Sequence, residues 1–120
     1  MRVAGAILLP VAYDAELADR LREALAGEPE VSEKRMFGGL AFLVAGRMAV
    51  CAGSQGDLMV RIDPADHDAL TADPRASPMV MRGRELAGWL LVEIDEAVSD
   101  DQLRGWVAHG VRYARSLPPG

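Results

Sequence analysis

The chain has 120 residues, of which 50% are hydrophobic and 26% are charged. These values are typical of one folded domain and exclude a largely disordered chain. With 18 acidic and 13 basic residues, the net charge is −5, which disfavours direct binding to a nucleic-acid backbone. No apolar run approaches the roughly 20 residues that cross a bilayer. The single cysteine, Cys51, excludes an intrachain disulfide and fits the cytoplasm.

We divide the chain into an N-terminal arm, residues 1–12, and one domain, residues 13–118. In the arm, Arg2 precedes the apolar stretch from Val3 to Ala12, which has the crude shape of a signal peptide. The charged part is one residue and the cleavage pattern is poor. We therefore favour an arm that adds an edge strand or packs on a partner.

A helix is predicted over residues 15–26, because Asp14 can cap it and Leu17, Leu21 and Leu25 recur on one face. A meander of short strands follows. Glycine-bearing turns separate these strands, and such short connections force antiparallel neighbours. The predicted strands are Val31–Phe37, Leu40–Val44, Arg47–Ala52 and Leu58–Ile62.

A short helix is then predicted from Asp63-Pro64 to about Thr71. The strands Met79–Arg82 and Gly88–Ile94 follow, joined through Gly83-Arg84-Glu85. A capping box at residues 99–102 opens a last helix that ends near residue 116, with Trp106 on its apolar stripe and predicted in the core. This order predicts an α+β fold, with one antiparallel sheet and helices mainly on one face.

The middle strands do not alternate in polarity. Leu40–Val44 and Met48–Ala52 are apolar at nearly every position, so both faces of the sheet need cover. Helices of the same chain can cover one face. A second subunit is the economical cover for the other, and the sequence therefore predicts a homodimer.

No constellation of residues indicates catalysis, a metal or a cofactor. Asp66, His67 and Asp68 are metal-ligand types, but consecutive helix residues cannot converge on one ion, so a solvated helix face is the preferred interpretation. Cys51 lies in an apolar strand, which favours a buried hydrophobe over a nucleophile, and nothing ties His109 to it. Neither phosphate-binding glycine motif nor a nucleophile elbow is present. We predict that the chain is not an enzyme.

Three arginines are candidates for anion binding: Arg61 on an otherwise apolar strand, and Arg82 and Arg84 beside a glycine turn. Internal ion pairs or an edge-strand guard are the competing interpretation. The pair Gly38-Gly39 is interpreted as a structural turn. Trp89 can serve either as core or as an interface anchor.

Several segments together resemble the N-terminal domain of the TfoX family, also called Sxy. The resemblance covers about Tyr13 to Pro118. Its most specific part is the Met-Phe-Gly-Gly signature at Met36, Phe37, Gly38 and Gly39 with the hairpin that follows. The segments are Lys34–Gly39, the hairpin through Gly46, Asp57–Ile62, Gly88-Trp89 and Tyr113–Pro118.

The resemblance implies a small α+β domain with a curved antiparallel sheet, of the secretion-chaperone-like type and often dimeric. The family's named members regulate bacterial competence as coactivators that contact a transcription factor, and they usually carry a C-terminal domain. We expect this chain to be a stand-alone first domain. The family supplies no catalytic residues, so the residues to watch are the four of the signature with Arg61 and Trp89.

These inferences lead to two hypotheses of different class. The first is a cytoplasmic, homodimeric regulatory domain that acts through protein contacts, with a transcription regulator as one candidate partner. The alternative is a small protein that binds an anionic ligand in an arginine-lined cleft. An enzyme and a DNA-binding protein are weaker alternatives.

Overall fold

The computed structural model describes residues 14–36, 38–54 and 56–118. Its centre is one six-stranded sheet with the order β1-β2-β3-β4-β6-β5, in which all neighbours are antiparallel. The predicted α+β class and antiparallel sheet are confirmed. The strands are β1 (Val31–Met36), β2 (Gly39–Val44), β3 (Arg47–Ala52), β4 (Asp57–Arg61), β5 (Ala76–Met81) and β6 (Arg84–Glu93).

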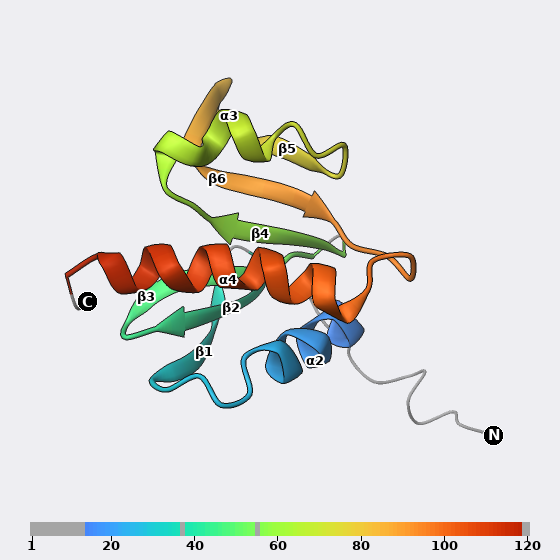
Figure 1. The fold of residues 1–120 in the computed structure, drawn as a ribbon, viewed down its shortest axis with the longest axis vertical. Coiled ribbons are helices and arrows are strands. Elements are labelled where there is room, and N and C mark those ends of the chain that lie inside the picture. Colours follow the sequence, from blue (N-terminus) through green and yellow to red (C-terminus); the bar gives the residue numbers. More distant parts are fainter. Residues whose placement is uncertain (1–13, 37, 55, 119–120) are drawn as a thin grey trace.

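The two longest helices lie on one face of this sheet. Figure 1 shows α4 (Asp100–Ser116) lying across the strands, with α2 (Ala15–Ala24) beside its first half. Helix α4 packs against β3 and β4, and α2 packs against α4. The short α3 (His67–Leu70) follows a 3-10 turn, η1 (Pro64–Asp66), and packs beside β6.

The predicted caps start these helices. The Asp14 carboxylate accepts hydrogen bonds from the backbone N–H groups of Glu16 and Leu17 at 2.9 and 3.1 Å. The capping box is formed in both directions: the Gln102 N–H donates to Ser99 Oγ at 3.1 Å, and the Ser99 N–H donates to Gln102 Oε1 at 2.8 Å. Each cap satisfies N–H groups that have no partner inside the helix.

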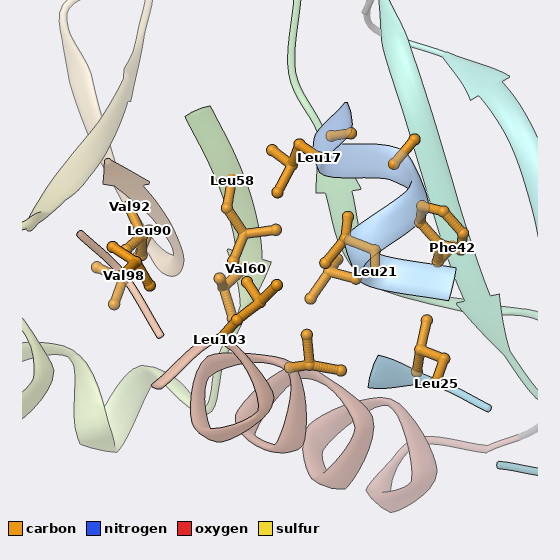
Figure 2. Packing of buried hydrophobic residues seen from close by; sticks show 14 of the residues in the cluster. Leu17, Leu21, Leu25, Phe42, Leu58, Val60, Leu90, Val92, Val98 and Leu103 are labelled. Atoms are coloured by element: carbon orange, nitrogen blue, oxygen red, sulfur yellow. The ribbon is translucent and has the colours of Figure 1, made fainter. Parts of the chain in front are cut away.

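The main core lies between the helices and the sheet. Figure 2 shows Leu17 and Leu21 of α2, Leu25 directly after it and Leu103 of α4 in one cluster with side chains of the strands. On β4, Leu58 and Val60 alternate into this core. Alternation of side chains along a strand therefore leaves the intervening residues on the opposite face.

A bulge in β3 brings α4 close to the sheet. The register passes from Phe42 opposite Val50 to Leu43 opposite Met48, which leaves Ala49 as an extra residue. A Cβ on Gly110 would lie 2.3 Å from the Ala49 carbonyl oxygen. Glycine at position 110 is therefore what permits the helix to approach this strand.

The β5–β6 hairpin differs from the prediction. Its turn is the pair Arg82-Gly83, with φ of 53° and 76°, and Arg84 already belongs to β6. The predicted connection through Gly83-Arg84-Glu85 and the strand start at Gly88 are wrong. The first residues of β6 are mostly exposed, so no apolar pattern marks them, and pairing with the edge strand β5 makes them a strand.

Two predictions concern residues outside those that the structure describes: the arm at residues 1–12 and the motif residue Phe37. Within the described ranges, no helix combines the length and the apolar character that a membrane crossing requires.

Candidate interaction surface

The sheet carries a second apolar cluster on the side away from α2 and α4, which we call the helix-free face. All of its members come from strands. Met59, for example, lies between Leu58 and Val60, which point into the main core. Its buried members are Ala41, Met48, Cys51 and Met59, and its partly exposed members are Met36, Leu43, Met79, Trp89 and Leu91.

Methionine dominates this face. Four of the six methionines in the chain belong to it, namely Met36, Met48, Met59 and Met79. Methionine is unbranched and polarizable, so it adapts to partners of different shape and is frequent on surfaces that bind several proteins. The helix-free face thus has the side-chain composition of an adaptable contact surface.

The single chain already covers the middle of this face. Ala41 and Cys51 are both 0% exposed, because the longer side chains of the same cluster pack over them. Part of the cover predicted for this face is thus supplied by the chain itself. The part left accessible is the partly exposed group that includes Leu43, Trp89 and Leu91.

Cys51 is a buried thiol at the centre of the helix-free face, as the sequence predicted. Burial, together with the nearby Asp57 carboxylate, raises its pKa to about 11. The thiol is therefore protonated at neutral pH, and a protonated thiol is a poor nucleophile.

The glycine pair of the signature has a structural role. Gly38 has φ of 72°, in the left-handed region that favours glycine. A Cβ on Gly39 would lie 2.2 Å from the Ala52 carbonyl oxygen, so this position admits no side chain. The predicted structural turn is confirmed. Met36, paired with Gly39 across the β1–β2 hairpin, belongs to the helix-free face.

Arg61 and Trp89, both singled out from the sequence, meet at one end of the sheet. They are direct cross-strand partners. The Arg61 guanidinium carbon lies 5.1 Å from the centre of the Trp89 ring and 5.3 Å from that of Tyr113 on α4. Both distances are in the range of cation–π contacts. Two aromatic rings from different elements therefore hold one cation.

Within the described part of the chain, the Arg61 guanidinium lacks some of the hydrogen-bond and ion-pair partners that it could have. Its Nε is buried and has no hydrogen-bond partner, and among the residues that the structure describes no carboxylate forms an ion pair with it. A guanidinium held in place with N–H groups to spare can bind a carboxylate or phosphate.

Arg82 and Arg84 do not join Arg61. Arg82 lies in the exposed β5–β6 turn and Arg84 opens β6, five residues before Trp89. Arg84 pairs with Met81 beside the turn, whereas Arg61 pairs with Trp89, on the other side of an irregularity in the β5–β6 register. The arginine-lined cleft predicted from the three residues is therefore not assembled, and Arg61 stands apart from the other two.

The sequence Asp66-His67-Asp68 is only partly a solvated helix face. Asp66 and Asp68 are exposed, but the His67 side chain is 12% exposed, with Nδ1 3.3 Å from Asp68 Oδ1. The described residues contain no group of three potential metal ligands. Burial of His67 was missed because α3 is short and its inward side is set by β6.

Sequence reasoning also missed three side chains of α4. Trp106, assigned to the core, does pack against the main core but is partly exposed, as are His109 and Tyr113. Their spacing, together with Gln102, places them on one side of the helix, since residues three and four apart are neighbours there. That spacing was the available signal, but only Trp106 was considered as part of a helix face, the apolar stripe.

The chain matches the model of the TfoX N-terminal domain over residues 23–114. This span runs from the end of α2 to the last turn of α4 and covers most of the chain. The chain belongs to the TfoX N-terminal domain family. Membership makes it a regulatory domain at the family level. Among curated proteins, none matches the chain.

Proposed function

We propose that this TfoX N-terminal domain is a cytoplasmic, non-catalytic regulator that acts through protein contacts made by its helix-free face. The observation that carries the proposal is the methionine-rich composition of that face, with Trp89 and Arg61 at its end. Tryptophan, arginine and methionine are enriched at protein interfaces. The net charge of −5 favours a protein partner over DNA.

The first partner that we propose is a second copy of the chain. Two such faces are complementary because each offers half-buried apolar side chains, among them Leu43, Trp89 and Leu91. A two-fold dimer pairs the same patch on both subunits. A transcription regulator is the proposed second partner, in line with the coactivator role of the family's named members.

The dimer is tested by measuring molar mass by light scattering at micromolar concentration. We expect a dimer for the native chain and a monomer for Leu91→Glu, because a carboxylate on the half-buried face is costly to desolvate. Ala108→Glu places the same charge on the exposed side of α4 and should leave the dimer intact.

Circular dichroism of each variant separates lost assembly from lost folding. A native chain that stays monomeric overturns the homodimer. A Leu91→Glu variant that is folded and still dimeric overturns the assignment of the interface to this face.

The regulatory part is tested in cells that lack the endogenous gene. Expression of the native chain should restore the levels of a set of transcripts. Ala108→Glu should restore them as well, whereas Leu91→Glu should not restore them. Transcript levels that do not depend on the chain would contradict a regulatory role.

A second function, anion binding, is favoured by the Arg61 guanidinium, which has no carboxylate partner among the described residues. Inorganic phosphate or a dicarboxylate such as succinate should raise the melting temperature of the native chain. The same gain should occur in Arg84→Met and disappear in Arg61→Met. An equal gain in all three proteins would show a general salt effect and remove this function.

A further inference from the structure

A cavity of about 430 Å³ lies between α3 and α4, outside the helix-free face. Its volume is in the range of about 300–1,000 Å³ that holds small molecules. One wall is a single side of α4, formed by Gln102, Gly105, Trp106 and His109. The other is formed by α3 and the segment that follows it, residues 69–75, and Val98 also lines the cavity.

Gly105 has no packing reason to be glycine. It lies inside the 17-residue helix α4, where glycine costs stability relative to alanine. An added Cβ would meet no atom within 4 Å, whereas one on Gly110 would meet the Ala49 carbonyl oxygen at 2.3 Å. Gly110 is required by the fold. The absence of a side chain at Gly105 instead keeps the wall of the cavity open.

Two rings of the α4 wall offer a flat surface and a hydrogen-bond donor. The Trp106 and His109 rings lie 6.0 Å apart at an angle of 49°. The Arg112 guanidinium, which can only donate, lies 2.8 Å from His109 Nδ1, so the proton of the neutral imidazole is on Nε2. Burial and the charge of Arg112 lower the pKa of His109, which keeps this tautomer at neutral pH.

The arginine that lines the cavity is already paired. Asp73 and Arg75 are opposite in sign, and Asp73 Oδ1 accepts the Arg75 backbone N–H at 2.9 Å. The Arg75 side chain pairs with Asp95 at 3.2 Å and donates to the Glu93 carbonyl at 3.2 Å. The lining residues therefore offer no free positive charge to an anion, so an uncharged ligand fits this environment better than an anion.

We propose that this cavity binds a small, flat, uncharged ring that carries a hydrogen-bond acceptor. The ring lies against the indole of Trp106, and its acceptor receives the Nε2–H of His109. Gly105 leaves room for the ring beside α4. This site is separate from the interaction surface, so its failure would leave the proposed function untouched.

Benzamide is the probe, because it is flat, uncharged and carries a carbonyl acceptor. The readout is the indole N–H signal of Trp106 in nitrogen–proton NMR spectra, assigned with Trp89→Phe. We expect a saturable shift with benzamide. Cyclohexanecarboxamide, which is not flat, and benzoate, which is charged, should bind at least about tenfold more weakly.

Gly105→Leu should fill the cavity and abolish the benzamide shift. Ala108→Leu adds the same side chain to the exposed side of α4 and should retain it. If Gly105→Leu does not fold, Trp106→Leu replaces it as the test variant. Benzamide binding is then followed through the NMR signals of the His109 ring and should again be lost. The absence of a saturable benzamide shift in the native chain would overturn the proposal. So would benzamide binding to Gly105→Leu as tight as to the native chain, or native-chain binding of cyclohexanecarboxamide as tight as that of benzamide.

Discussion

Single residues in α4 show how one amino-acid type can have opposite roles. Gly110 faces the β3 bulge, where no Cβ fits, and Gly105 borders the cavity, where a Cβ meets nothing. Both glycines have helical neighbours, so neither local conformation nor helix propensity distinguishes them. Only the atoms that other elements bring to each position decide which glycine the fold requires.

Alanine substitutions should therefore change stability in opposite directions. Gly105→Ala should raise the free energy of unfolding by about 0.5–1 kcal/mol, because it gains helix propensity without a clash. Gly110→Ala should lower it by about 1–3 kcal/mol, because the helix must move away from a backbone carbonyl. Urea unfolding followed by circular dichroism measures both. A destabilised Gly105→Ala would contradict the open space at that position.

At the scale of elements, ion pairs and caps join the helices to the rest of the chain. Arg20 of α2 donates to the Val98 carbonyl at 2.7 Å and to Asp100 at 3.1 Å, at the start of α4. Arg115, in the last turn of α4, binds Glu28 and Glu30 in the connection after α2. Helix α4 is therefore attached at both ends to α2 or its continuation, across the same face of the sheet.

The start of α4 depends on its capping box. Ser99→Ala removes the hydroxyl that accepts the Gln102 N–H and should lower the free energy of unfolding by about 1 kcal/mol. Ser99→Asp keeps an acceptor and places a negative charge at the helix N-terminus, so it should retain most of the stability. Thermal unfolding of both variants measures the difference. Unchanged stability in Ser99→Ala would show that the cap contributes little.

The whole molecule combines one sheet with two faces of different character. One face is covered by α2 and α4, and the other consists of strand side chains alone. The charges are distributed outside both clusters, and the described residues contain no buried charged group. Solvent and salt therefore act mainly on pairs at the periphery, such as Arg22 with Glu33.

Stability should fall in acid. Hydrogen bonds from Arg22 lower the pKa of Glu33, and hydrogen bonds from Arg75 and the Ala97 N–H lower that of Asp95. A carboxylate whose pKa is lowered by folding stabilises the native state above its ordinary pKa of about 4, and this contribution is lost as the pH falls. Melting temperatures between pH 7 and pH 3 at low salt test this, because salt screens exposed pairs.

Arg22→Met should reduce the fall in melting temperature between pH 7 and pH 3, because Glu33 then lacks the cation that lowers its pKa. Arg47→Met is the control, because Arg47 donates to the backbone carbonyl of Pro118 at 2.8 Å and a carbonyl does not titrate. A pH profile that is the same in Arg22→Met and in the native chain would contradict the role assigned to this pair.

The elements and fold class were predictable because they depend on local patterns. The Leu17, Leu21 and Leu25 spacing, the caps at Asp14 and Ser99, and the short glycine turns each act within a few residues of chain. The turn of the β5–β6 hairpin was mispredicted because the first residues of β6 are mostly exposed. Such residues carry no apolar pattern, and it is their pairing with β5 that makes them a strand.

The sequence by itself determined an α+β domain of the TfoX N-terminal type, with one antiparallel sheet and a buried, unreactive Cys51. Only the tertiary structure decided that Arg61 meets Tyr113 from a distant helix, that Arg82 and Arg84 lie at the β5–β6 turn instead, and that an open cavity lies between α3 and α4. The reason is physical: local periodicity fixes which way a side chain points from its own element, whereas contacts between elements depend on how those elements pack.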